Sequence, residues 1–144
     1  MTDTRDIQEE IIDEFSILGD DKESTIYYIM EIGNKLPPFP EDERTDDNII
    51  KGCQSKVWLT TRFEDNKVVY LADSNTDITK GLISLLIRVL SNRTPKEILD
   101  TELYFIDKIG MSSIIGSQRS NGLASMIKQM KLFALAYQQS KLNV

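Results

Sequence analysis

The sequence contains no histidine, and this absence removes whole classes of catalytic and metal sites. A Ser-His or Cys-His catalytic pair cannot form, and neither can a His-ligated metal site. The one cysteine, Cys53, cannot close an intramolecular disulfide or build a zinc or iron–sulfur site from the chain's own thiols. Because a lone thiol suits a reducing compartment, we expect a cytoplasmic protein.

Long apolar runs are also missing, and glycine and proline are scarce. The longest apolar runs, such as Leu82–Ile87, fall far short of the roughly 20 residues that cross a bilayer. The charged start Met1–Asp6 has no apolar segment behind it and is not typical of a secretory signal. With 7 glycines and 4 prolines among 144 residues, the composition is neither collagen-like nor disordered.

Basic charge is in deficit, because 23 acidic residues face 17 basic ones and the net charge is −6. Nucleic acids and anionic membranes bind basic surfaces, so we expect neither as a partner. A length of 144 residues is close to that of one domain. Such a chain buries roughly two thirds of its unfolded surface and needs no disulfide or metal to fold. We therefore expect a single domain over residues 1–144.

The first part of the chain has the periodicity of helices. The apolar positions of residues 5–18 share one helical face, and so do those of Ile26–Gly33. The run Leu36-Pro37-Pro38-Phe39-Pro40 ends the second helix, because proline lacks the amide donor and restricts the residue before it. The acidic segment Pro40–Asn48 is then predicted to be an exposed loop.

The middle of the chain has the composition of β-strands. Val57–Phe63 and Val68–Leu71 are rich in β-branched and aromatic residues, and Glu64–Lys67 between them suits a hairpin turn. Ile49-Ile50 is a candidate start of a third strand. The sequence therefore predicts a small antiparallel sheet of about three strands.

Helical patterns return after the predicted sheet, over Leu82–Val89, at Tyr104–Ile109 and from about Gln118 to Ser140. Thr94-Pro95-Lys96-Glu97 is typical of a helix start, with Thr at the N-cap, Pro at the first position and Glu completing a capping box. We expect the last helix to face inward through Leu123, Met126 or Ile127, Met130, Phe133 or Ala134, and Tyr137. Helices, then a small sheet, then helices predict an α+β fold.

The lone thiol lies between the acidic segment and the first predicted strand, in Lys51-Gly52-Cys53-Gln54-Ser55-Lys56. A free cysteine is most often a small buried hydrophobic residue. The alternative is a nucleophile on a loop, since Gly52 permits unusual backbone angles and the flanking lysines would favour the thiolate. The residue pattern alone leaves both interpretations open.

Longer blocks of sequence carry more information than this spacing. Gly52-Cys53-Gln54-Ser55-Lys56-Val57-Trp58 follows two further blocks, Leu36-Pro37-Pro38-Phe39-Pro40 and Glu43-Arg44-Thr45-Asp46. Later blocks are Ala72-Asp73-Ser74, Ile78–Leu82, Thr94-Pro95, Phe105–Gly110 and Arg119–Leu123. From about Ile26 to Lys131 the chain resembles the SufE family, the sulfur acceptors of cysteine desulfurases in iron–sulfur cluster biogenesis. It departs from the family at Asn75, where an acidic residue is common.

The resemblance implies roles for particular residues. Cys53 would accept sulfur as a persulfide, and Arg119 would stabilise the thiolate or persulfide anion or contact the partner. For Arg119 the alternative is an ion pair with Asp or Glu at a helix start. Gly52, Asp73 and Lys80 would support the loop or line the partner surface, and the last two would otherwise serve helix-start chemistry and solvation. Val57 and Trp58 are expected in the core.

The resemblance also implies partners and a fold. The sulfur donor would be a SufS-like desulfurase that depends on pyridoxal phosphate, and the recipient a SufBCD-like scaffold complex. The fold would resemble the SufE family and the IscU-type scaffold. We expect no cofactor or metal in this chain and no independent catalysis, because the pyridoxal phosphate chemistry belongs to the desulfurase. The identity of that desulfurase, the final destination of the sulfur and homodimer formation stay open.

Three alternative functions compete with the sulfur acceptor. One is a non-catalytic adaptor that activates a desulfurase by docking, and another is a sulfur relay to a different thiolation pathway. The third is a peroxide-reactive thiol, which would need a resolving thiol that this chain lacks.

The chemistry of persulfides predicts how the thiol is held. Ambient thiols would strip an exposed persulfide, so we expect Cys53 in an apolar recess formed by its sequence neighbours Ile49-Ile50 and Val57. Burial there would raise the thiol pKa. Docking on a desulfurase would swing the loop outward about Gly52, with Glu41–Asp47 as part of the docking surface.

Overall fold

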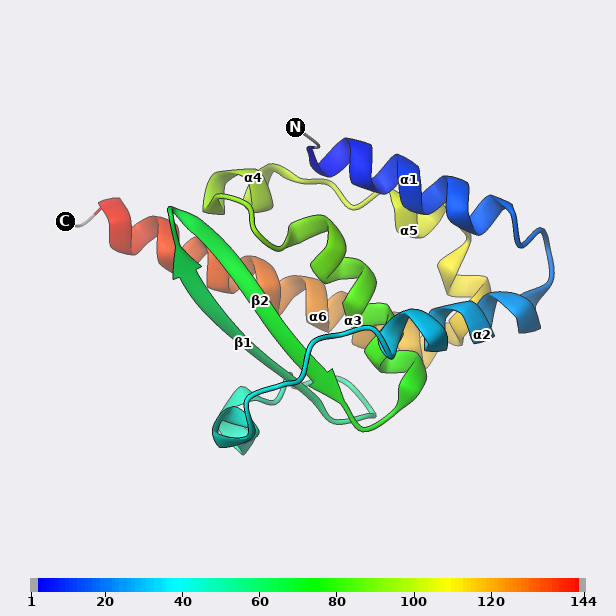
Figure 1. Cartoon of the computed structure of the whole chain (residues 1–144), viewed down its shortest axis with the longest axis horizontal. Helices are drawn as coiled ribbons and strands as arrows, with labels where there is room; N and C mark the ends of the chain where they lie inside the picture. The colour runs from blue at the N-terminus through cyan, green and yellow to red at the C-terminus, as the bar shows by residue number, and fades with distance from the viewer. Residues whose placement is uncertain (1–2, 143–144) are drawn as a thin grey trace.

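The computed structural model describes residues 3–142 and has an α+β architecture, as predicted (Figure 1). Two antiparallel strands form a hairpin that lies against a group of helices. The elements in chain order are α1 (Thr4–Ser16), α2 (Lys22–Gly33), the 3₁₀ turns η1 (Glu41–Glu43) and η2 (Asp46–Asn48), β1 (Val57–Glu64), β2 (Lys67–Ser74), α3 (Asp77–Leu90), α4 (Pro95–Asp100), α5 (Phe105–Lys108) and α6 (Met111–Leu142).

The helix starts follow local capping chemistry. The Asp3 carboxylate accepts from the backbone N–H of Asp6 and completes a capping box with it. Asp21 caps α2 in a similar way, by accepting two backbone N–H groups. The predicted capping box at Thr94 and Glu97 is confirmed, and Pro95 occupies the first position of α4.

The hairpin confirms the predicted pair of strands and their turn. Asp65 and Asn66 both have positive φ, 53° and 67°, as a two-residue type I′ turn requires. The register runs from Val57 opposite Ser74 to Glu64 opposite Lys67. The second strand is longer than predicted, because its end remains paired with β1 through Asp73 and Ser74.

The prediction of about three strands is wrong, since the sheet has two strands within residues 3–142. Ile49 forms only an isolated bridge with Trp58, and the Ile50 N–H donates to the Val57 carbonyl at 2.8 Å. Gly52 then adopts a φ of +97°, which turns the chain away before a third strand can form.

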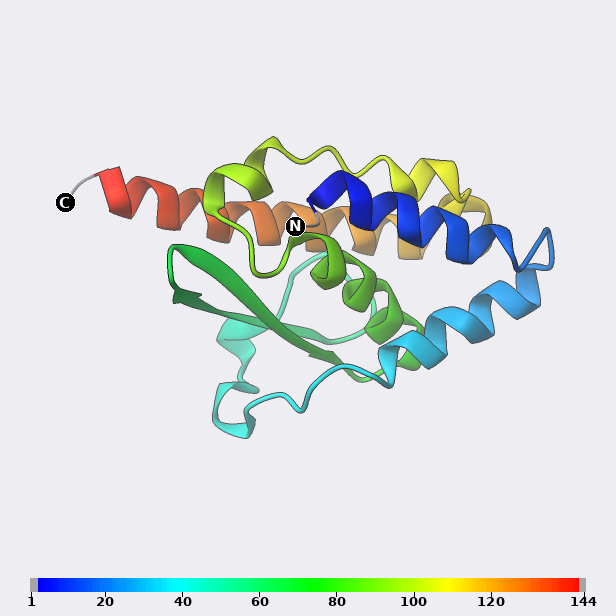
Figure 2. The same cartoon turned by 45° about the horizontal axis from the view of Figure 1, so that its top comes forward.

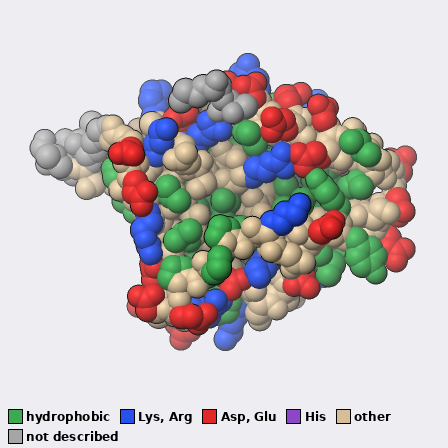
Figure 3. Space-filling model, in the orientation of Figure 1, with side chains coloured by type: hydrophobic (Ala, Val, Ile, Leu, Met, Phe, Trp, Pro, Cys, Tyr) green, Lys and Arg blue, Asp and Glu red, His purple; other side chains and the backbone are tan. Residues whose placement is uncertain are grey.

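The segment at 40–48, predicted to be an exposed loop, is anchored at its centre. Its two 3₁₀ turns carry exposed acidic side chains, which gather at the lower left of the molecule in Figure 3. Glu43, however, accepts a hydrogen bond from the Thr60 hydroxyl at 2.7 Å and forms an ion pair with Arg62. These contacts hold the middle of the segment against β1.

The core lies between the hairpin and the helices, with α3 at its centre. Nine of the 14 residues of α3 are buried, and its glycine Gly81 allows close contact with α2. The inner face of the hairpin adds Val57, Leu59, Val68, Tyr70 and Ala72 to the same core. None of the helices in residues 3–142 is long and apolar enough to cross a membrane.

The last helix begins earlier than the predicted Gln118. Helix α6 starts at Met111 and is interrupted at Gly116, whose φ of 85° and ψ of 170° are not helical. Leu123, Met126, Met130 and Ala134 are buried, while Ile127, Phe133 and Tyr137 are half-buried. Figure 2 shows that the chain between η2 and β1, which carries the thiol, passes between α6 and the hairpin.

Candidate functional site

The loop that carries the thiol is seated directly on α6. The Cys53 thiol donates to the carbonyl oxygen of Gly122, with Sγ and oxygen 3.5 Å apart. A Cβ atom on Gly122 would lie 3.5 Å from that sulfur, and one on Gly52 would lie only 2.4 Å from the Ser125 hydroxyl oxygen. The first distance is an ordinary contact and the second is a clash, so it is glycine at position 52 that lets the loop backbone approach the helix closely.

Beside the thiol lies a cavity of about 120 Å³. Apolar side chains of α3 and α6 form part of its wall, namely Ile78, Leu82 and Met126. Polar side chains form the rest, namely Gln54, Ser55, Thr76, Thr79, Gln118 and Arg119. The cavity therefore brings an apolar wall and a polar wall to one sulfur atom.

Burial governs the acidity of the thiol. Cys53 is half-buried, and loss of contact with water raises the pKa of its thiol. Lys51 and Lys56, which would favour the thiolate in the alternative of a loop nucleophile, are exposed to solvent. The resting thiol is therefore protonated near neutral pH, as its donated hydrogen bond to Gly122 also requires.

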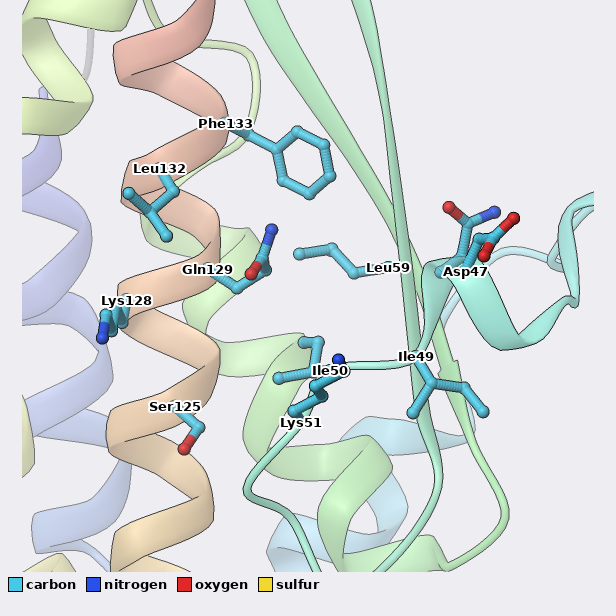
Figure 4. A pocket seen from close by; sticks show the side chains of 11 residues that line it. Asp47, Ile49, Ile50, Lys51, Leu59, Ser125, Lys128, Gln129, Leu132 and Phe133 are labelled. Carbon is cyan, nitrogen blue, oxygen red and sulfur yellow. The ribbon is translucent and has the colours of Figure 1, made fainter.

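The thiol lies in a recess, but not among the residues predicted to form it. Ile49 and Ile50 line a separate cavity of about 480 Å³, between the loop and α6. Figure 4 shows Ile50, Leu59 and Phe133 directed into the space between β1 and α6. The turn at Gly52 places the thiol on the other side of the loop, so its apolar neighbours come from distant segments.

Three hydroxyl groups form a closed ring at the polar wall. Thr76 donates to Thr79 at 2.8 Å, Thr79 donates to Ser55 at 3.3 Å, and the Ser55 and Thr76 oxygens lie 3.0 Å apart. Thr76 occupies the N-cap position of α3, yet its side chain makes no capping hydrogen bond. Its hydroxyl is thus directed away from its usual partner and toward the loop.

The end of the loop, at Lys56, is held by a group of hydrogen bonds that we call the clamp. The Asn75 side-chain oxygen accepts the Lys56 N–H at 3.0 Å, and the Asn75 N–H donates to the Lys56 carbonyl at 3.2 Å. The Ser74 hydroxyl also donates to that carbonyl, at 2.8 Å. Asn75, the departure from the family pattern, therefore fixes the end of the loop.

Arg119, which the family resemblance assigns to this sulfur or to the partner surface, lines the thiol cavity. Its side chain is exposed, and within residues 3–142 it has no ion-pair or hydrogen-bond partner. The alternative of an ion pair at a helix start is therefore not found there. Its guanidinium is available to an anion that enters the cavity.

Asp73 and Lys80 lie together but do not line the cavity of the thiol. They form an ion pair at 3.4 Å, and Asp73 also pairs with Arg44. The Arg44 guanidinium lies over the rings of Phe39 and Trp58, 5.5 and 5.0 Å from their centroids. Partial burial acts to raise the pKa of Asp73, but hydrogen bonds from Arg44 and the next backbone N–H, with a nearby lysine, hold it below its ordinary value.

These contacts separate the candidate residues into two groups. Cys53 and Arg119 both line the thiol cavity, and Gly52 precedes the thiol and packs against Ser125 of α6. Asp73 and Lys80 instead belong to an ion-pair cluster at the end of the hairpin. Val57 is fully buried as expected, while Trp58 is half-buried beneath Arg44.

The hydroxyl groups of the polar wall were not predicted from the sequence. Ser55 and Gly122 lie inside blocks that were recognised, but no role followed from their type. Thr76 and Thr79 precede and open a helix, where hydroxyls usually serve as caps. Among residues 3–142, no group of three or more Asp, Glu or Cys side chains is placed to hold a metal ion.

The fold and site define a small α+β protein built around one half-buried thiol. Residues 9–134 match the SufE family, described as an Fe-S metabolism associated domain. An uncharacterized SufE-like protein of Rhizobium meliloti is 37% identical over 128 residues, which cover 85% of this chain and 91% of the relative. An uncharacterized SufE-like protein of Synechocystis sp. is 38% identical over 106 residues, or 74% of this chain and 67% of the relative.

A solved structure has a similar fold. It is the solution structure of a hypothetical protein from Thermus thermophilus, with a TM-score of 0.75 and 18% identity, covering 92% of this chain and 96% of that chain. The present chain belongs to the SufE family and is thereby associated with iron–sulfur metabolism.

Proposed function

We propose that this protein accepts persulfide sulfur on Cys53 from a cysteine desulfurase, stimulates that enzyme, and delivers the sulfur to an iron–sulfur cluster scaffold. The carrying observation is the chain's single thiol, half-buried at a cavity in a protein of the SufE family. The donor is a SufS-like enzyme that depends on pyridoxal phosphate, and the recipient is a SufBCD-like complex.

The transfer is a thiol–persulfide exchange. The Cys53 sulfur attacks the terminal sulfur of the donor's persulfide anion, so that a new sulfur–sulfur bond forms at Cys53 and the bond within the donor persulfide breaks. The donor thiolate leaves and takes up the proton that Cys53 loses. Exchange of this kind requires thiolate and access.

The resting site supplies little of either requirement. Burial raises the thiol pKa, and the chain contains no histidine to act as a base. Activation therefore has to come from the partner, which suits an acceptor that works only when docked. The same burial shields a stored persulfide from small thiols.

Mass spectrometry tests the proposal directly. After incubation with a SufS-like desulfurase and cysteine, the protein is expected to gain the mass of one sulfur atom, located at Cys53 by peptide mapping. The Cys53→Ser variant, which removes only the sulfur, should gain none and should fold as the wild type does. No sulfur on the wild-type protein with any desulfurase supplied would overturn the proposal.

The adaptor alternative gives a different result in the same reactions. A protein that activates the desulfurase only by docking retains most of its stimulation after Cys53→Ser. A sulfur acceptor loses that stimulation, because no thiol remains to take the sulfur away. Turnover of the desulfurase, measured with both proteins, separates the two.

A further inference from the structure

The polar wall of the thiol cavity carries hydroxyl groups to which the protonated thiol makes no hydrogen bond. Three hydroxyls, those of Ser55, Thr76 and Thr79, bond to one another beside a sulfur whose own hydrogen bond goes to Gly122 on α6. Each hydroxyl has one hydrogen to donate, and in the ring each hydrogen is shared with a neighbouring hydroxyl. Rotation of one hydroxyl would direct a donor into the cavity.

Loading of sulfur onto Cys53 changes the group that the site has to bind from a hydrogen-bond donor to a charged acceptor. The thiol Cys53–SH donates to a carbonyl, whereas the persulfide Cys53–S–S⁻ has no hydrogen and only accepts. The Gly122 carbonyl, itself an acceptor, can no longer bond the inner sulfur. The outer sulfur carries the negative charge and needs donors, because an unpaired buried charge is costly.

The size and lining of the cavity meet this need. Its volume of about 120 Å³ exceeds the roughly 30 Å³ that one water molecule occupies in the liquid, so one more sulfur atom fits. Cys53, the three hydroxyls and Arg119 all line this one cavity. Thr79 is only 6% exposed, so its hydroxyl is shielded from competing water.

We propose, on the basis of the sulfur-acceptor function above, that the hydroxyls of Ser55, Thr76 and Thr79 bind the outer sulfur of the Cys53 persulfide. They are positioning residues that distinguish the loaded state from the empty one. Gly122 holds the thiol, and the hydroxyl ring holds the persulfide anion. This second role explains why the Thr76 hydroxyl bonds within the ring and does not cap α3.

The test loads the protein chemically, so that it does not depend on a desulfurase. Inorganic polysulfide is used to sulfurate Cys53 in the wild type and in the double variant Thr76→Val/Thr79→Val. The near-ultraviolet absorbance of the persulfide anion is then titrated against pH. The double variant is expected to raise the apparent persulfide pKa by about one unit, a tenfold change in the protonation equilibrium.

Two further variants separate this effect from a loss of folding. Thr79→Ser retains the hydroxyl and should titrate like the wild type. Thr101→Val removes an equally buried hydroxyl whose partners are Thr4 and the Glu97 carbonyl, outside the cavity, and should also leave the persulfide pKa unchanged. Alkylation of the unloaded thiol should change less than twofold in all of them, since Sγ bonds Gly122.

An unchanged persulfide pKa in the double variant would overturn the inference, and so would an equal shift in Thr101→Val. Neither result bears on sulfur transfer from the desulfurase, which the mass measurement decides separately. Conversely, failure of the enzymatic transfer leaves the chemical titration able to confirm or reject the hydroxyl site.

Discussion

At the scale of single residues, the thiol of Cys53 is held in a state that resists reaction. Its hydrogen bond to the Gly122 carbonyl requires the proton, and half-burial raises the pKa of the thiol. Both effects favour the neutral form, whereas nucleophilic attack needs the thiolate. The environment of the sulfur therefore protects it rather than activates it.

This state predicts the pH dependence of alkylation. A raised pKa means that the thiolate fraction of native Cys53 keeps rising at pH values where an ordinary cysteine is already ionised. The rate of reaction with iodoacetamide should therefore level off at a higher pH in the native protein than in the same protein unfolded in urea. Identical profiles in the two states would contradict the protected thiol.

Two glycines beside the thiol differ in what a methyl group would meet. In Gly52→Ala the new Cβ would clash with the Ser125 hydroxyl, and the φ of +97° would be strained, at a cost of about 1–3 kcal/mol. Gly122 is helical, and its Cβ would make an ordinary contact with Cys53, so Gly122→Ala serves as the matched control. Urea denaturation should show the loss of stability only for Gly52→Ala.

The rate at which Cys53 is alkylated gives a second measurement on the Gly52→Ala and Gly122→Ala variants. Strain at Gly52 should lift the loop from α6 and speed the reaction of Cys53, whereas alanine at position 122 leaves the loop seated. Equal stability and equal alkylation for the two variants would show that the loop does not depend on this close approach.

At the scale of elements, the crossing of α2 and α3 sets the position of the thiol cavity. A Cβ on Gly81 would lie 1.9 Å from the Ile29 carbonyl oxygen, and one on Gly33 would lie 2.7 Å from the Gly81 nitrogen. The two helices thus touch through their backbones. Because Ile78 and Thr79 of α3 line the cavity, any shift of α3 reaches the site.

Gly81→Ala is therefore expected to destabilise the fold strongly. The opposing atoms are backbone, which cannot rotate away, so the cost should reach or exceed the upper end of the about 1–3 kcal/mol typical of overpacking. Ser84→Ala, in the same helix, should change the free energy of unfolding by about 0.5 kcal/mol or less. Thermal or urea unfolding of both variants checks this, and similar midpoints would contradict the backbone contact.

How far the sequence predicts the elements depends on how local their causes are. The capping box at Thr94 and the type I′ turn at Asp65-Asn66 rest on neighbouring residues, and both the helix start and the hairpin were predicted. The end of β2 was missed because Asp73 looks like a turn residue until Arg44, far away in the sequence, supplies its partner. The single bridge at Ile49 likewise depends on the turn made later at Gly52.

The residues of the candidate site likewise differ in whether local sequence or the packed fold determines their place. Cys53 and Arg119 were found because long sequence blocks mark them. The hydroxyl ring was not, because Ser55 and Thr76 lie 21 positions apart and only the packed fold brings them to one cavity. The apolar recess was predicted from sequence neighbours, but the backbone turn at Gly52 gives the sulfur distant ones instead.

At the scale of the whole molecule, the loop that carries the thiol separates two cavities. Residues 47–51 line the larger one and residues 53–55 the smaller, and α6 contributes to both. The loop is fixed at its far end by the clamp at Lys56, so we expect any outward movement of the loop to occur around Gly52. Outward movement would open the smaller cavity without unfolding the hairpin.

Such movement predicts that a docked partner exposes the thiol. Cys53 should alkylate slowly in the free protein and faster when a SufS-like desulfurase is added whose own nucleophilic cysteine has been replaced. The acceleration should saturate with desulfurase concentration, because it requires the complex. Equally fast alkylation with and without the partner would mean that the thiol is already accessible.

Charge at the edge of the loop offers a way to locate the docking surface. Asp46 and Asp47 are exposed beside the loop, whereas Glu43 is held by Thr60 and is unavailable to a partner. Neutralising the first two, as Asp46→Asn/Asp47→Asn, should raise the desulfurase concentration needed for half-maximal acceleration, and the difference should shrink at high salt.

The matched control removes the same charge elsewhere, as Asp13→Asn/Asp20→Asn at exposed positions in α1 and the turn after it. If net charge alone attracts the desulfurase, both pairs weaken the acceleration equally. If the acidic segment next to the loop is itself part of the docking surface, only the Asp46 and Asp47 pair does. An equal effect of the two pairs would show that the acidic segment is not part of the docking surface. Whether docking exposes the thiol would still be decided by the alkylation rates of the unmutated protein.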